Sequence, residues 1–281
     1  MRIRIVDAFT DQPFSGAPAG VVLLDAFPED AWMQRVAAEV NHAETAFLHP
    51  ITDNSEKSKS ADWALRWFTP AVEVALCGHA TLAAAHVLAA GSVRFATRSG
   101  ILTARTAADG LITLDFPTAP LTPVEAGPAL AAALGAEVKA VHHTGPDTDD
   151  LLVELAGEKA VREVVPDLRA LIPLSNRGVI VTAAGEGGGY DFVSRFFGPA
   201  VGVDEDPVTG SAHTALAPYW AARLGRDELT GYQASRRGGF VRVRLRGGRT
   251  ELAGHAVTVI DGALTAGLLG AGTAGDPLHV A

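Results

Sequence analysis

A chain of 281 residues, 48% hydrophobic and 20% charged, can bury a full core and has room for two domains of ordinary size. Its formal net charge of −9 argues against a nucleic-acid or anionic-membrane partner, because either would require a basic surface. The single cysteine, Cys77, excludes an internal disulfide framework, and no apolar run is long enough to span a membrane. We therefore expect a cytoplasmic protein.

The first part of the chain alternates strand-like and helix-like patterns. Helical spacing of apolar residues predicts helices at Pro28–Val40 and Ala80–Ala90. Short apolar runs bounded by turn residues predict strands at Ile3–Val6, Val21–Leu24, Thr45–Leu48, Leu65–Phe68, Val93–Phe95, Leu102–Thr106 and Leu111–Phe116. The polar stretch Asp53–Ser60 is predicted to be an exposed loop. Prolines 117, 120 and 123 cannot continue a central strand, so they mark a linker.

The second part repeats this order. Helices are predicted at Pro128–Leu134, Pro166–Ala170 and Ala212–Leu224, with a polar turn before the second of them. Strands are predicted at Val141–His143, Leu151–Leu155, Gly178–Thr182, Tyr190–Phe196, Gly231–Ala234, Gly239–Leu245 and Ala256–Ile260. The repeat predicts an α+β fold of two pseudo-symmetric domains, residues 1–117 and 118–281, with a ligand site in the cleft between them.

Two short stretches place a glycine-containing turn directly ahead of an Ala-rich helical run: Cys77–Thr81 and Asp206–Ala212. A helix N-terminus has unpaired backbone N–H groups and partial positive charge, so it can hold an anion such as a carboxylate. The glycines at 78 and 210 are 210 − 78 = 132 positions apart, close to half of the chain. This spacing favours two tandem units that hold one small acidic ligand between them.

Three titratable residues belong to this arrangement. Glu44 enters the apolar run Thr45–Leu48, and burial raises a carboxylate's pKa above its ordinary value of about 4.3, toward the range in which it exchanges a proton at neutral pH. His79 follows Gly78 directly, where an imidazole can hydrogen-bond a substrate or share a proton with a carboxylate. Asp206 precedes Pro207 at the second turn and is either a turn residue or a second carboxylate of the site.

Signals for other chemistries are weak. The glycine-rich loop at 185–189 lacks the Lys-Ser/Thr of a phosphate-binding loop, and no Gly-x-Ser-x-Gly or His-Glu-x-x-His motif occurs. The four lysines stand among polar neighbours, which argues against a pyridoxal Schiff base. We expect chemistry without a metal or an organic cofactor.

These motifs together resemble the phenazine-biosynthesis isomerase (PhzF-like) family, whose fold is that of diaminopimelate epimerase. The resemblance runs nearly end to end, and the residues that carry it are Val6–Thr10, Phe14–Gly20, Asn41–Phe47, Phe68–Pro70, Cys77–Thr81 and Glu205–Ala212. It implies two domains, each a curled sheet around a central helix, and often a homodimer. Ala43 stands where the family often has serine.

The resemblance also implies roles. It makes Glu44 the proton shuttle of a cofactor-independent isomerase, with His79 and Asp206 assisting the transfer or orienting the substrate. The residues that would hold a small carboxylate substrate through backbone and hydroxyl groups are Gly78, Gly210 and Ser211.

Two alternatives remain open. Cofactor-independent epimerases of this fold use two thiols, and the second position is Thr209 here, so one cysteine excludes that mechanism but not a one-base epimerase or dehydratase reaction through Cys77. A binding protein could also keep the fold and lose turnover. An ionisable Glu44 pointed into a closed cleft favours the enzyme.

Overall fold

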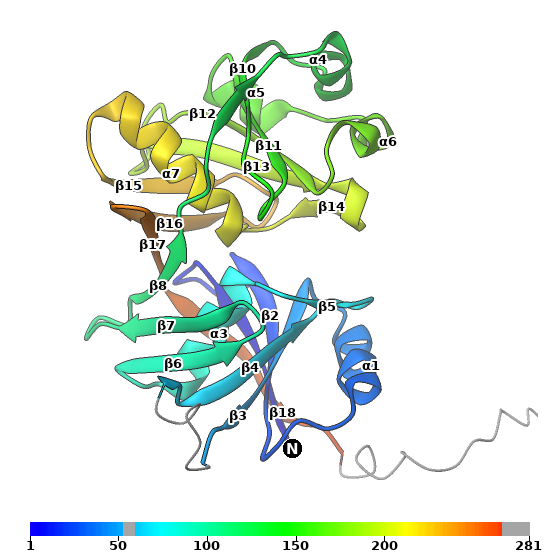
Figure 1. Ribbon diagram of the computed structural model, residues 1–281, viewed down its shortest axis with the longest axis vertical. Coiled ribbons are helices and arrows are strands. Elements are labelled where there is room, and N and C mark those ends of the chain that lie inside the picture. Colours follow the sequence, from blue (N-terminus) through cyan, green and yellow to red (C-terminus); the bar gives the residue numbers. More distant parts are fainter. Residues whose placement is uncertain (53–59, 266–281) are drawn as a thin grey trace, which may run out of the picture.

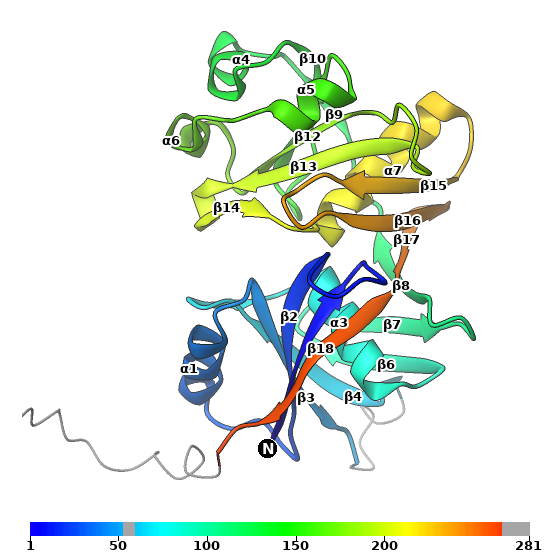
Figure 2. The same ribbon diagram turned by 180° about the vertical axis from the view of Figure 1, so that it is seen from behind.

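The computed structural model describes residues 1–52 and 60–265. The predicted exposed loop at 53–60 lies outside these residues apart from Ser60. Figures 1 and 2 show two halves, one above the other, with the first third of the chain in the lower half. None of the helices in the described ranges is long and apolar enough to cross a lipid bilayer.

In residues 1–52 and 60–265, the lower half contains a curled sheet and the helices α1 (Asp30–Val40) and α3 (Gly78–Leu88). Its strands are β1 (Arg2–Ala8), β2 (Ala17–Leu23), β3 (Glu44–Pro50), β4 (Trp63–Phe68), β5 (Glu73–Val74), β6 (Ser92–Thr97), β7 (Gly100–Thr106), β8 (Ile112–Pro117) and β18 (Ala256–Ala263). They pair in the order β18, β1, β2, β3, β4, β6, β7, β8, and β5 adds to β4.

The upper half contains the remaining elements. Its helices are α4 (Pro128–Leu134), α5 (Glu158–Glu163), α6 (Leu168–Leu171) and α7 (Gly210–Leu224), with 3-10 turns η1 (Ile172–Leu174) and η2 (Pro199–Val201). Its strands are β9 (Thr122–Val124), β10 (Val138–His143), β11 (Asp150–Leu155), β12 (Gly178–Ala184), β13 (Phe192–Gly198), β14 (Val203–Asp206), β15 (Glu228–Gln233), β16 (Gly239–Arg246) and β17 (Arg249–Gly254).

Two connections join the halves. Strand β8 of the lower half pairs antiparallel with β17 of the upper half. The chain then returns: β18 pairs antiparallel with β1, so its colour at the red end of the scale lies beside the blue N-terminal strands in Figure 2. The last described strand therefore belongs to the sheet that the first strand begins.

The two central helices, α3 and α7, are buried, and their many small residues allow this. Helix α3 contacts β1, β2, β3, β7, β8 and β18, and α7 contacts β11, β15, β16 and β17. In α3 every residue from His79 to Ala85 is buried, because small alanine side chains let strands approach a helix from most directions. A left-handed residue ends each helix, Ala89 after α3 and Gly225 after α7. Both helices therefore present their N-terminal ends at defined positions.

The sequence-based assignments hold for most elements, with local corrections. Helices α3 and α7 begin at Gly78 and Gly210, two residues earlier than predicted, so the glycines belong to the first turns. The stretch predicted as a polar turn contains α5, in which buried Glu158 pairs with Arg162 one turn later.

Four of the described strands, β5, β9, β14 and β17, were not predicted. Pro123 of the predicted linker lies in β9, which pairs with β10. The mixed pattern of β17 becomes strand-like only through pairing with β8 and β16. Strand β16 matches its prediction: Val241 and Val243 are buried while Arg242 is exposed.

Candidate active site

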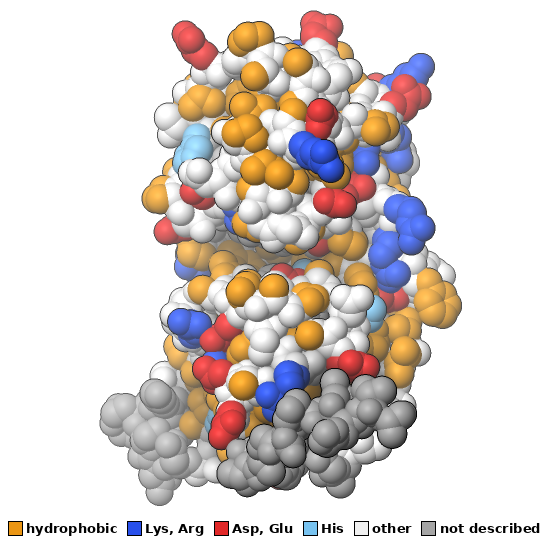
Figure 3. All heavy atoms as spheres, turned by 90° about the vertical axis from the view of Figure 1, so that its right-hand side faces the viewer, with side chains coloured by type: hydrophobic (Ala, Val, Ile, Leu, Met, Phe, Trp, Pro, Cys, Tyr) orange, Lys and Arg blue, Asp and Glu red, His pale blue; other side chains and the backbone are white. Residues whose placement is uncertain are grey.

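A cavity of about 520 Å³ lies between the two halves. Seen from the side, the surface is hollowed at this level (Figure 3). The cavity has the size of a small-molecule site. All six predicted site residues line it: Glu44, Gly78, His79, Asp206, Gly210 and Ser211.

The N-termini of α3 and α7 meet at this cavity. A β-carbon added to Gly78 would lie 3.3 Å from the Cα of Gly210, and one added to Gly210 would lie 3.2 Å from the Cα of Gly78. Both contacts are tighter than most real Cβ contacts, so glycine allows this close approach of backbone to backbone. The N-cap residues, Cys77 and Thr209, form no side-chain cap. First-turn N–H groups of both helices are therefore free of capping side chains.

Glu44 and His79 form an ion pair at the first of these helix ends. Glu44 is the first residue of β3 and His79 lies in the first turn of α3, with 2.9 Å between Oε2 and Nε2. The side chains are 19% and 5% exposed, respectively. Glu44 thus reaches the cavity from the edge of an apolar strand and contacts an imidazole rather than being enclosed by apolar side chains.

The groups around His79 favour its charged form. Burial alone would lower the pKa of the imidazole, but its interactions with Cys77 and Glu44 outweigh burial and raise the pKa well above 6.5. Burial, with a further contribution from Glu44, raises the pKa of the Cys77 thiol above 9.0. Cys77 is therefore a thiol at neutral pH, and the Glu44 carboxylate is the group that supports the imidazolium.

Cys77 lies close to the same imidazole. Its sulfur is 3.7 Å from His79 Nδ1, and the residue is buried in the cavity wall. One ligand atom from each of Glu44, Cys77 and His79 lies within 4.8 Å of the others, a donor set that zinc accepts. A metal bound there would occupy the same carboxylate and imidazole that could transfer a proton.

Asp206 ends β14 at the second helix end. The Thr209 hydroxyl donates to its Oδ2 at 2.5 Å, while Oδ1 is buried and has no hydrogen-bond partner within the described ranges. Burial raises the pKa of Asp206; His79 opposes this effect and Glu44 adds to it. The site therefore combines two carboxyl groups and an imidazole, and the pKa values of Asp206 and His79 are raised above their ordinary values.

Sequence reasoning missed the residues that support the second helix end. Gln233, fully buried on β15, accepts the Thr209 N–H at 2.8 Å and donates to the Asp206 carbonyl at 2.7 Å. It fixes the turn between β14 and α7. No local pattern marks a glutamine that acts on residues 24 and 27 positions earlier.

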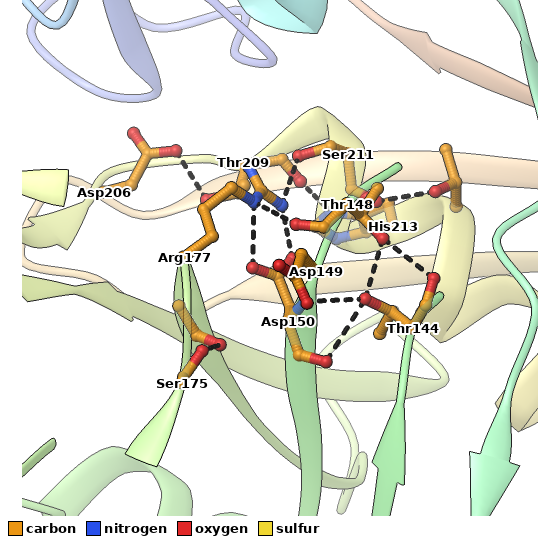
Figure 4. A network of polar contacts seen from close by, with 12 residues as sticks. Thr144, Thr148, Asp149, Asp150, Ser175, Arg177, Asp206, Thr209, Ser211 and His213 are labelled. Atoms are coloured by element: carbon orange, nitrogen blue, oxygen red, sulfur yellow. Dashed lines mark hydrogen bonds and ion pairs between the residues drawn. The ribbon is translucent and has the colours of Figure 1, made fainter. Parts of the chain in front are cut away.

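Arg177 was missed for the same reason. Its guanidinium reaches Ser211 and pairs with the fully buried Asp150, as Figure 4 shows. Burial raises the pKa of Asp150 to about 6, although Arg177 opposes this shift. The three residues are separated by 27 and 34 positions. Only the fold brings them together.

Comparison with known proteins gives the family. The profile of the phenazine biosynthesis-like protein family matches residues 6–262. The chain belongs to this family. Relatives described as uncharacterized isomerases are 51% identical in Pseudomonas aeruginosa, over 92% of this chain and 95% of theirs, and 45% identical in Halalkalibacterium halodurans, over 92% and 96%. The protein is accordingly an isomerase of the phenazine biosynthesis-like family.

Solved structures give the same assignment for the fold. A PhzF-family protein of Enterococcus faecalis has a TM-score of 0.85 at 39% identity, covering 93% of this chain and 97% of its own. A hydroxyproline epimerase of Agrobacterium vitis has a TM-score of 0.59 at 13% identity, covering 93% and 91%, which is a likeness of fold alone. The predicted α+β class and the resemblance to epimerase-like folds are confirmed.

Proposed function

We propose that this isomerase moves a proton between two carbons of a small carboxylate-bearing metabolite, with Glu44 as the carrier and no metal or organic cofactor. The observation that carries the proposal is the Glu44–His79 ion pair in a cavity that also contains two open helix N-termini. A positioned carboxylate can act as a general base, and the charged imidazole beside it can donate a hydrogen bond to the carboxylate or to the substrate.

In the proposed reaction, Glu44 removes a proton from a carbon next to an activating group. The electrons of that C–H bond pass into the adjacent unsaturated system, and the first-turn N–H groups of α3 and α7 and the His79 imidazolium stabilise the resulting negative charge. The carboxylic acid of Glu44 then returns the proton to a different carbon. Glu44 is regenerated as a carboxylate, and no atom is gained or lost.

A screen in D₂O tests the proposal. Wild-type protein is incubated with a panel of β,γ-unsaturated carboxylic acids, and proton NMR follows deuterium incorporation and double-bond migration. Glu44→Gln keeps the shape of the side chain and removes the base, so incorporation should fall by about a hundredfold or more. Glu39→Gln, an exposed glutamate of α1, is the matched control. Full incorporation by Glu44→Gln would refute the role of Glu44.

A one-base epimerase or dehydratase reaction through Cys77 is the second candidate. The contact between Cys77 Sγ and His79 Nδ1 favours it, since an imidazole can take a thiol proton. The raised pKa of Cys77 disfavours the thiolate that this route needs. Metal analysis of the purified protein tests the further possibility that the Glu44, Cys77 and His79 cluster holds an ion.

We further propose that the chain forms two domains that meet at this cavity, residues 1–117 and 118–281, with β18 completing the sheet of the first. The placement of one central helix in each half supports this division, while the pairing of β18 with β1 assigns residues 256–263 to the sheet of the first domain. A homodimer and a cytoplasmic location stay predictions; light scattering on the purified protein tests the dimer.

A further inference from the structure

Arg177 contributes a positive charge to the cavity wall. It is the one lysine or arginine among the described residues that line the cavity, whereas Glu44, Asp147 and Asp206 contribute carboxyl groups. Its side chain is 31% exposed, so the guanidinium is neither buried in the core nor free in solvent. An anionic ligand in such a cavity requires a compensating cation, because burying an unpaired charge is costly.

The protein holds this guanidinium in one orientation. Nε donates to Asp150 Oδ1 at 2.9 Å and to the Thr148 carbonyl at 2.6 Å, and Nη2 pairs with Asp150 Oδ2. The Thr144 hydroxyl in turn accepts the Asp150 N–H at 2.9 Å. The guanidinium also lies 5.2 Å from the centre of the Phe196 ring. The fully buried Asp150 carboxylate thus fixes one edge of the Arg177 guanidinium. Binding of a ligand to this guanidinium then costs less side-chain entropy.

The clamp leaves specific donors unused. Nη1 has no hydrogen-bond partner in residues 1–52 and 60–265, while Nη2 also donates to Ser211 Oγ at 3.1 Å (Figure 4). Because Ser211 accepts this bond, its own hydroxyl hydrogen remains available to donate. Ser211 stands in the first turn of α7, where the helix dipole adds positive potential. Arg177 Nη1 and the Ser211 hydroxyl therefore form a pair of adjacent donors at the cavity.

We propose that Arg177 and Ser211 bind a carboxylate group of the substrate, and that Asp150 is the residue that positions Arg177 for this task. The proposal rests on the proposed function, since it names the end of the substrate opposite to the proton transferred by Glu44. One carboxylate oxygen accepts from Arg177 Nη1 and the other from Ser211. Such charge-assisted hydrogen bonds are stronger than neutral ones and select a carboxylate over its amide.

Binding of a simple probe tests this without turnover. Crotonate and the isosteric neutral crotonamide are titrated into ¹⁵N-arginine-labelled protein, and the Nε–H signal of Arg177 is followed by NMR. The signal is assigned by its loss in Arg177→Lys. Crotonate should shift it and crotonamide should not. Equal shifts with the two ligands, or no shift with crotonate, would overturn the proposal.

Variants separate binding from folding. Removing Arg177 alone would leave Asp150 buried without its partner, so the double variant Arg177→Gln with Asp150→Asn keeps hydrogen bonding and removes both charges. Its affinity for crotonate, read from the ligand's own signals, should fall about tenfold or more. The control is Arg162→Gln with Glu158→Gln, which removes a comparable pair with a buried carboxylate away from the cavity. Unchanged affinity in the first double variant, with its fold verified by circular dichroism, would contradict the proposal.

The two proposals can fail separately. Glu44→Gln should bind crotonate as the wild type does, because Glu44 is absent from the carboxylate-binding pair. If the D₂O screen yields no exchange while crotonate still shifts Arg177, the proton transfer is wrong and the anion site stands. If exchange occurs and crotonate binds the Arg177→Gln, Asp150→Asn variant normally, the anion site is wrong and the proton transfer stands.

Discussion

The N-termini of α3 and α7 present the same backbone device with different side chains. Each is an Ala-rich helix with glycine at its first position and no capping side chain, and the two glycines nearly touch. Around α3 stand an ion pair and a thiol, groups that exchange protons. Around α7 stand the Asp206 carboxyl group and hydroxyl, amide and guanidinium groups that can donate hydrogen bonds. In the proposed function, the same backbone arrangement serves two tasks: proton transfer at the N-terminus of α3 and substrate binding at the N-terminus of α7.

The largest effect should follow from a change at the first end. His79→Gln removes the imidazolium beside Glu44, and kcat on the substrate that the D₂O screen identifies should fall about a hundredfold, with KM much less affected. His86→Gln, near the other end of the same helix, is the control and should keep kcat. A His79 variant that changes KM alone would place binding rather than proton transfer at this end.

A tenfold effect is expected at the second end. Ser211→Ala removes the hydroxyl that lies beside Arg177, so KM should rise about tenfold while kcat stays within a few-fold of wild type. Ser92→Ala, exposed at the start of β6, is the matched control. A loss confined to kcat would contradict the assignment of substrate binding to the N-terminus of α7.

The smallest effect concerns stability and pH. The folded state raises the pKa of Asp206 above the 3.8 of an unperturbed carboxyl, so its charged form destabilises the fold at neutral pH. The penalty is absent below pH 3.8, where folded and unfolded states are both protonated, and grows as pH rises through the folded pKa. Asp206→Asn should therefore raise Tm at pH 7 by a few degrees, the usual size of a single stabilising substitution, while lowering activity.

Calorimetry at pH 7 and near pH 3 checks this sign. The gain in Tm of Asp206→Asn over wild type should disappear at the lower pH. A variant less stable than wild type at pH 7 would mean that the Asp206 charge stabilises the fold. Asp206 would then be a structural residue rather than one kept for function, and the proposed difference between the N-termini of α3 and α7 would be smaller.

Local sequence patterns predicted what depends on neighbours in the chain. The Ala-rich runs after Gly78 and Gly210 predicted two buried helices, and the flanking glycines and titratable residues predicted a shared site. Helix α5 was not predicted, because its stability depends on hydrogen bonds that Glu158 accepts from the Tyr190 hydroxyl and the Glu186 N–H. Arg177 and Gln233 were not predicted as site residues, because their contacts with the site arise from the pairing of strands that are distant in the sequence. Such contacts have no signature in a single sequence.

The central claim is that a carboxylate, and not the thiol, carries the proton. Glu44→Gln and Cys77→Ser are assayed side by side for solvent deuterium incorporation into the same substrate, with binding of that substrate measured for each. We predict that Glu44→Gln binds substrate but loses about a hundredfold or more in incorporation, and that Cys77→Ser keeps most of it. An active Glu44→Gln together with an inactive Cys77→Ser would contradict the account and assign the chemistry to Cys77.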